Sequence, residues 1–201
     1  MKQISLIFTL LILALSVNAQ ETTNTEEITG EALLYYQDAV NGDANAQCNL
    51  GDCYYKGQGV TRDYNQAVHW YRKAAEQGHA TAQRNLGFSY HQGQGVTQDY
   101  TQAVYWFLKA AEQGITEAQC NFGAYYYNGV GVTQDYTQAV YWWRKAAEQG
   151  NDMAQNNLGF CYYHGQGVTQ DKTKGIELLR KAARQGNKLA QDNLREFGYD
   201  W

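Results

Sequence analysis

The sequence contains no proline, few serines and no excess of positive charge, and these absences narrow the possible functions. None of the 201 residues is proline, which excludes proline-rich recognition segments. The 16 Lys and Arg residues are outnumbered by 20 Asp and Glu residues, so the net charge is −4. Because general binding to a phosphate backbone needs a basic excess, we expect no nucleic-acid partner.

Long apolar runs are also absent, except at the start of the chain. Lys2 precedes an apolar run from Ile4 to Val17, and Val17 and Ala19 are the small residues expected before a cleavage site at Gln20. The run is shorter than the roughly 20 residues that span a bilayer. We predict a signal peptide (1–19) and a flexible linker (20–30); a retained N-terminal anchor is the alternative. The mature protein is then exported, periplasmic or secreted (lumenal or extracellular in a eukaryote), without stable membrane insertion.

The rest of the chain repeats itself with a period of 36 residues, the signature of a repeat architecture. Four units align without gaps, and we place them at 46–81, 82–117, 118–153 and 154–189. Residues 31–45 match only the second half of a unit, and residues 190–201 match only the first half. We expect these two partial units to cap the array.

Each unit contains two helical patterns separated by a glycine-rich turn. Ala46, Leu50 and Tyr54 share one face of a first helix, and Ala67 and Trp70 lie on one face of a second. The segment 57–60 (GQGV) breaks the first helix, Thr61 or Asp63 can cap the second, and Gly78 can end it. The pattern predicts a series of helical hairpins.

A glycine recurs in the middle of each first helix, at Gly51, Gly87, Gly123 and Gly159. Glycine costs about 1 kcal/mol there relative to alanine, so we expect a neighbouring helix backbone to approach closely. The tryptophans at 70, 106 and 142 are expected to fill the space between repeats. Because one hairpin cannot bury both faces alone, the hairpins must stack into an all-α solenoid.

The pattern A-x-x-x-[LF]-G-x-x-[YF]-x-x-G-x-G-V-x-x-D-x-x-x-A-x-x-W-[YFW]-x-K-A-A-E-x-G resembles the Sel1-like repeat, a relative of the tetratricopeptide repeat. The fourth unit departs from it at Gly175, Leu178 and Leu179, as a terminal unit does. The resemblance implies a right-handed α/α superhelix that serves as a non-catalytic adaptor for protein complexes, often exported, and it leaves the partner open.

The resemblance also places the first helices on the concave face of the superhelix. Positions 48, 52, 55 and 56 of the first helix lie opposite the packed stripe, and they and their equivalents vary most between units. We predict that these registers line a groove for a protein segment or peptide, formed by Tyr55, Arg84, Phe88, His91, Tyr127, Phe160 and Tyr163. In the alternative, the rings pack against neighbouring first helices and bind nothing. The asparagines at 49, 85, 121, 157 and 193 flank this face, and we expect hydrogen bonds between units from them.

The four cysteines do not predict disulfides. Cys48 and Cys120 share a register two units apart, on the order of 20 Å, whereas a disulfide needs Cα atoms within about 7 Å. We predict four free thiols, with Cys53 and Cys161 buried and with Cys48 and Cys120 more exposed and open to intermolecular crosslinks.

No residue pattern predicts catalysis, a metal or a cofactor. Ser89 is the only serine after residue 19 and lacks the lysine three positions later that a serine β-lactamase uses; Cys161 and His164 form a lone helical pair. Two alternatives remain: a β-lactamase or cell-wall hydrolase, as described for some cysteine-rich members of the family, and a secreted effector that engages a host receptor.

Charge is unevenly distributed between the two ends of the chain. Residues 20–60 hold one basic and seven acidic groups, whereas residues 171–201 hold seven basic and five acidic groups. This contrast favours head-to-tail self-association, although ordinary surface variation is the simpler interpretation.

Overall fold

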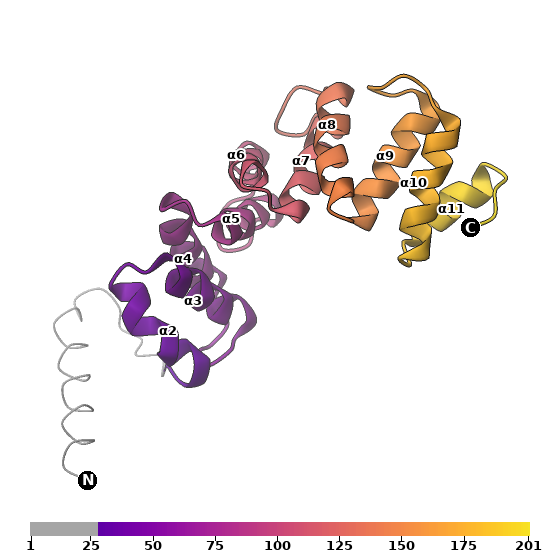
Figure 1. Cartoon of the computed structure of the whole chain (residues 1–201). Coiled ribbons are helices and arrows are strands. Elements are labelled where there is room, and N and C mark those ends of the chain that lie inside the picture. The colour runs from indigo at the N-terminus through magenta and orange to yellow at the C-terminus, as the bar shows by residue number, and fades with distance from the viewer. Residues whose placement is uncertain (1–27) are drawn as a thin grey trace, which may run out of the picture.

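The structure, a computed structural model, describes residues 28–201 as ten stacked α helices (Figure 1). The predicted signal peptide and most of the predicted linker lie outside the described residues. The helices are α2 (Gly30–Val40), α3 (Ala44–Lys56), α4 (Tyr64–Glu76), α5 (Ala80–Gln92), α6 (Tyr100–Glu112), α7 (Thr116–Asn128), α8 (Tyr136–Glu148), α9 (Asp152–His164), α10 (Lys172–Arg184) and α11 (Lys188–Glu196).

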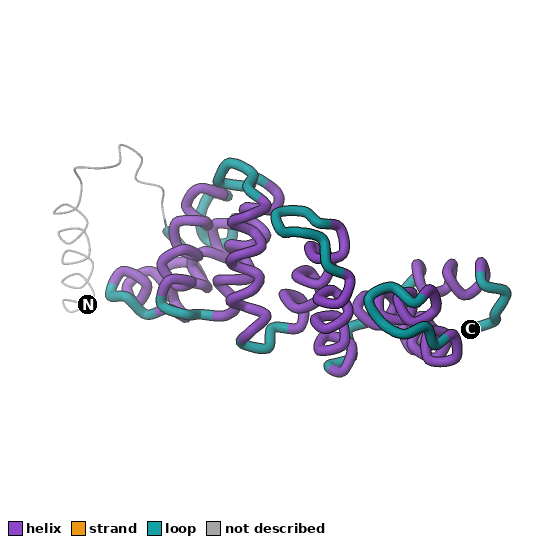
Figure 2. The backbone as a smooth tube through the Cα atoms, turned by 90° about the horizontal axis from the view of Figure 1, so that it is seen from above, coloured by secondary structure: helices purple, strands orange, loops and turns teal. Residues whose placement is uncertain are grey.

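The helices follow one another along an extended array, with α2 and α11 at opposite ends (Figure 1). Each helix packs mainly on its neighbours in sequence, and loops join them at the edges of the array (Figure 2). The pairs α3/α4, α5/α6, α7/α8 and α9/α10 are the four predicted hairpins. The predicted all-α architecture of four repeats with flanking helices is therefore confirmed.

The helix ends use the predicted polar residues and glycines. Asp63 caps α4 by accepting hydrogen bonds from the backbone N–H groups of Asn65 and Gln66. Gly57 ends α3 with a left-handed φ of +75°. Asp43 caps α3, which starts at Ala44, two residues before the repeat boundary chosen from the sequence. Just before α2, the backbone N–H of Thr29 donates a hydrogen bond to the carbonyl of Gly59. This bond anchors the start of α2 to the loop of the first repeat.

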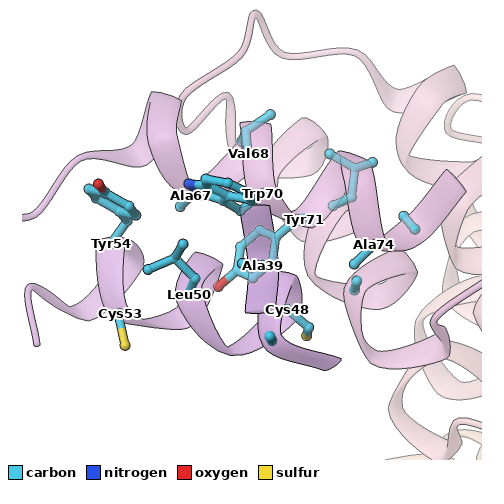
Figure 3. Packing of buried hydrophobic residues seen from close by; sticks show 14 of the residues in the cluster. Ala39, Cys48, Leu50, Cys53, Tyr54, Ala67, Val68, Trp70, Tyr71 and Ala74 are labelled. Atoms are coloured by element: carbon cyan, nitrogen blue, oxygen red, sulfur yellow. The ribbon is translucent and has the colours of Figure 1, made fainter. Parts of the chain in front are cut away.

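The core of the described residues consists of four clusters, and each cluster extends across a junction between neighbouring units. Leu50, Ala67 and Trp70 lie together between α3 and α4 (Figure 3). Trp106, from the second repeat, belongs to the same cluster as Trp70 and is only 9% exposed. The prediction that the tryptophans fill the space between repeats is confirmed.

The mid-helix glycines make room for aromatic rings in the first three repeats. A Cβ on Gly51 would lie 2.6 Å from Cδ1 of Tyr71, and Phe107 and Trp143 cover Gly87 and Gly123 in the same way. In the fourth repeat the nearest atom is instead a backbone atom, because a Cβ on Gly159 would lie 2.9 Å from the carbonyl oxygen of Gly175. The predicted close approach of a helix backbone is thus correct for the fourth repeat, and a ring takes its place in the others.

A ladder of buried glutamines, which the sequence analysis did not predict, ties each hairpin to the previous one. Gln83 on α5 donates from Nε2 to the carbonyl of Ala75 on α4 (3.1 Å) and accepts from Nε2 of Gln113 on α6 (2.7 Å). Equivalent pairs recur around Gln119 and Gln155. Since a buried amide must find partners, these bonds fix the register of one hairpin on the next.

Candidate binding face of the first helices

The predicted binding residues lie on the first helices, on the surface that we call the first-helix face. Side-chain hydrogen bonds join successive first helices, such as that from Nδ2 of Asn85 on α5 to Oδ1 of Asp52 on α3 (3.1 Å). A second such bond runs from Nδ2 of Asn193 on α11 to Oδ1 of Asn156 on α9 (2.9 Å). The predicted hydrogen bonds between units from the repeated asparagine are confirmed at these two positions.

Tyr55 and Tyr127 occupy the same register two repeats apart and are held in the same way. The hydroxyl of Tyr55 donates to Oε1 of Gln94 (3.3 Å), and that of Tyr127 donates to Oε1 of Gln166 (2.9 Å). Each glutamine belongs to the loop of the next repeat, so the rings are positioned before any ligand binds. Tyr55 is 37% exposed.

His91 and Tyr163 occupy the equivalent register in the second and fourth repeats, with different partners. Nδ1 of His91 lies 2.6 Å from the hydroxyl oxygen of Tyr125 on the next first helix. Tyr163 stacks on Phe197 beyond α11, with ring centroids 3.9 Å apart and the rings nearly parallel. The C-terminal cap therefore uses one face of Tyr163, which leaves this ring less available to a partner.

Phe88 and Phe160 are half-buried and pack on other rings. Phe88 packs edge to face on Phe107 of its own hairpin, with centroids 5.1 Å apart. Phe160 packs on His164 at 4.3 Å and approaches Phe197 at 6.4 Å. The two predicted rings of the fourth repeat therefore pack against the C-terminal cap, and Tyr127 packs on Trp143, whereas Tyr55 and Phe88 border free surface around α3 and α5.

The free surface around α3 and α5 is hollowed into a depression of about 240 Å³, which we call the α3–α5 depression. Its lining contains three of the predicted residues together with four others, and consists of Asp52, Tyr55, Lys56, Tyr71, Arg84, Asn85 and Phe88. Sequence reasoning omitted Lys56, although position 56 is one of the registers that vary between repeats.

Asp52 is the acceptor at the centre of this depression. Its Oδ1 accepts from the hydroxyl of Tyr71 (2.6 Å) and from Nδ2 of Asn85 (3.1 Å), while Nζ of Lys56 lies 3.9 Å from its Oδ2. Burial, followed by the hydrogen bond to Asp52, raises the pKa of Tyr71 well above its ordinary value, so this hydroxyl stays a donor. The carboxylate of Asp52 is therefore already supplied with donors from the protein.

Arg84 has unused donor capacity. Its Nη2 donates to Oδ1 of Asn85 (2.9 Å), whereas its Nε is buried and has no hydrogen-bond partner. An unsatisfied buried donor costs about 1–3 kcal/mol. With Arg84 and Lys56 against Asp52, the depression carries a net charge of +1 beside the partly exposed rings of Tyr55 and Phe88. This arrangement suits a ligand carboxylate next to an apolar group.

The predicted exposure of two cysteines is wrong. Cys48 and Cys120 are only 3% and 5% exposed, as buried as Cys53 and Cys161, and all four thiols are free. A helix inside an array is covered on two sides, and Cys120 belongs to a cluster with residues of the fourth repeat. Burial raises the pKa of the Cys48 and Cys120 thiols to about 12, which keeps them protonated and poorly suited to crosslinking.

The described residues offer neither a cluster of metal ligands nor a membrane-spanning helix. Between residues 28 and 201, three or more His, Cys, Asp or Glu side chains nowhere gather closely enough to bind a metal ion. No helix in this range has the length and apolar character needed to cross a membrane.

Comparison with known proteins supports the interpretation of the fold. The Sel1 repeat pattern matches residues 44–79, 80–115, 116–151 and 152–187. A crystal structure of a protective antigen from uropathogenic Escherichia coli, described as displaying an SLR fold, is 44% identical, with a TM-score of 0.78 over 83% of this chain and 36% of the other. A Sel1 repeat protein from Oxalobacter formigenes is 37% identical, with a TM-score of 0.74 over 81% of this chain and 66% of the other.

This chain thus spans about a third of the length of the E. coli protein and about two thirds of that of the Oxalobacter protein. The Helicobacter pylori cysteine rich protein B is more distant, at 25% identity and a TM-score of 0.52 over 66% of this chain and 96% of its own. The comparison with curated proteins gives no match. Since the repeat pattern covers more than two thirds of the sequence, the chain belongs to the Sel1 repeat family.

Proposed function

We propose that this protein is an exported, non-catalytic scaffold that binds an extended segment of a partner protein along the first-helix face. The α3–α5 depression is the anchor point, where Arg84 and Lys56 pair with an acidic side chain or a terminal carboxylate of the partner. The proposal rests on one observation. Arg84 lines the α3–α5 depression, and the buried Nε of its guanidinium has no hydrogen-bond partner.

The rings around the depression supply the apolar part of the contact. Tyr55 is fixed by its bond to Gln94, and Phe88 by its packing on Phe107, so little side-chain entropy is lost when a partner binds. Aromatic and arginine side chains in such positions dominate the energy of many interfaces. A carboxylate that draws the guanidinium of Arg84 outward lets its donors pair, which favours acidic over basic segments.

Export is supported by the apolar N-terminal run and fits the similarity to a protein that is described as a protective antigen. The test is fractionation of cells that express the full chain, followed by N-terminal sequencing. Export predicts a mature protein that starts at Gln20 outside the cytoplasm, and an uncleaved cytoplasmic protein would contradict it.

The binding site is tested by selecting peptides from a random displayed library on the mature protein. We expect enriched peptides with an acidic residue beside an apolar one. Arg84→Ala and Phe88→Ala should each weaken their binding at least tenfold. His69→Ala, on the exposed side of α4, is the matched control and should leave the affinity unchanged. Binding that is indifferent to Arg84→Ala and Phe88→Ala would refute the site.

A further inference from the structure

The C-terminal repeat carries a second and larger hollow, on the outer side of α10, which we call the α10 groove. It has a volume of about 540 Å³ and is lined by Lys172, Thr173, Ile176, Glu177, Arg180, Lys181, Arg184 and Tyr199. The 13 residues of α10 include five basic residues and one acidic residue. The chain after α11 crosses one edge of the groove, where Nε of Arg180 donates to the carbonyl of Asp200 (3.1 Å).

The basic character of this groove is specific to the last repeat. Arg184 stands at the register of Glu76, Glu112 and Glu148, and Lys172 stands at that of Tyr64, Tyr100 and Tyr136. Val140, at the register of Ile176, is covered by residues of the fourth repeat, whereas Tyr141, Arg144 and Glu148 on the same side of α8 are exposed. Ile176 itself is only 5% exposed and Tyr199 is 39% exposed, so the accessible part of the groove consists of its basic residues and Tyr199.

The opposite end of the array presents a surface of complementary character. Leu34 on α2 is 72% exposed and stands at the register of Trp70, which in the first repeat is only 7% exposed. Glu31 and Asp38 lie on the same side of α2, at positions −3 and +4 from Leu34. Residues 28–55 contain no Lys or Arg, so this end is purely acidic.

We propose that copies of this protein associate head to tail, with α2 of one copy lying in the α10 groove of the next. Leu34 then packs on Tyr199, while Glu31 and Asp38 pair with basic residues of α10. At 1.5 Å rise per residue, the two acids are about 10 Å apart and Lys172 and Arg180 about 12 Å apart, so each acid can face a cation.

The contact is heterologous, since two different surfaces meet, and it therefore builds open chains of copies. It does not extend the internal repeat, because Arg195 on α11 stands where Gly51 and its equivalents receive an aromatic ring. A single helix in a groove buries little area, so the association is weak and sensitive to salt.

The test is the weight-average mass of the mature protein, measured by sedimentation from micromolar to millimolar concentration. The mass should grow continuously with concentration at low salt and return to that of a monomer at high salt. Glu31→Lys with Asp38→Lys and, separately, Arg180→Glu with Arg184→Glu should each abolish the growth. A mixture of the two double variants should restore it, because each reversed end then finds an oppositely charged partner.

Matched reversals elsewhere, Glu112→Lys with Glu148→Lys and Lys73→Glu with Lys145→Glu, change the net charge equally and should not abolish association. A monomer at every concentration, a mass that saturates at two copies, or a mixture that stays monomeric would each overturn the proposal. An acidic partner protein that occupied the α10 groove instead would leave the purified protein monomeric. Circular dichroism confirms that the variants remain folded.

Discussion

In the third repeat the ring of Trp143 lies over Gly123, whereas in the fourth repeat Leu179 takes the register of the tryptophan and Gly175 faces Gly159. The tryptophan fills the space between α7 and α8 and donates from Nε1 to the carbonyl of Cys120 (3.0 Å). In the fourth hairpin a Cβ on Gly175 would lie 2.8 Å from the carbonyl oxygen of Gly159, so α9 and α10 meet backbone to backbone.

The difference shows that one hairpin geometry can be packed in two ways. A large ring over one glycine can be exchanged for a smaller side chain and a second glycine, provided that the helices move closer. The last repeat therefore lacks the tryptophan packing of the interior repeats. The same repeat also carries the basic residues of the α10 groove.

The largest effect is expected from removing the ring. Trp143→Ala should lower the free energy of unfolding by about 3–5 kcal/mol, because it leaves a cavity and removes the hydrogen bond to the carbonyl of Cys120. Leu179→Ala is the comparison in the fourth repeat and should cost less, since a smaller side chain is lost. Urea denaturation measures both, and an equal or larger cost for Leu179→Ala would contradict the two packing modes.

Adding a methyl group to the glycines sharpens the comparison. Gly175→Ala should cost about 3 kcal/mol, because the backbones of α9 and α10 must separate. Gly123→Ala should also destabilise the wild type, where its Cβ would lie 2.6 Å from the Trp143 ring. In the Trp143→Ala background the same change should instead stabilise by about 1 kcal/mol, through helix propensity alone. The absence of this reversal of sign would show that the ring is not the obstacle.

The glutamine ladder should distinguish the interior of the array from its end. Gln119→Ala removes two bonds, one to the carbonyl of Ala111 and one from Nε2 of Gln149, and should cost about 2 kcal/mol. Gln191→Ala loses one bond, to the carbonyl of Ala183, and should cost about half as much. Equal costs in urea denaturation would argue against the ladder as the feature that fixes the register.

The sequence was sufficient to predict the helices, their caps and the role of the tryptophans, because each depends on local patterns repeated four times. The sequence was not sufficient to predict the burial and contacts of residues that lie between two hairpins. A helical wheel gives Cys48 and Cys120 an outer position, yet the adjoining hairpin covers that side. The first-helix face shows the same limit: Arg84 and Phe88 were identified by their variability, whereas their meeting with Asp52 and Tyr71 depends on how two hairpins stack.

The remaining prediction concerns alkaline pH and compares the folded with the unfolded chain. Burial raises the pKa of Cys48, Cys120 and Cys161 from 9.0 to about 12. The folded state therefore keeps protons that the unfolded state releases, and the unfolding free energy falls as the pH rises above 9.0 toward 12. Each thiol contributes at most about 1.4 kcal/mol per pH unit in that window.

Urea denaturation at neutral and alkaline pH measures this loss. Cys48→Ala with Cys120→Ala should reduce the slope of stability against pH, even though the variant is less stable at neutral pH. Native thiols should also resist alkylation at pH values where the denatured chain reacts fully. Rapid labelling of Cys120 in the folded protein would contradict its burial.

The most direct measurement of the proposed function is site-specific photo-crosslinking in whole cells. A photoreactive amino acid at positions 55, 91 and 127 samples the first-helix face, and one at position 69 samples the exposed side of α4. The proposal predicts a common adduct from the first three positions, none from position 69, and a lower yield when Arg84→Ala is added. Adducts formed at position 69 while positions 55, 91 and 127 capture nothing would contradict the assignment of the binding face.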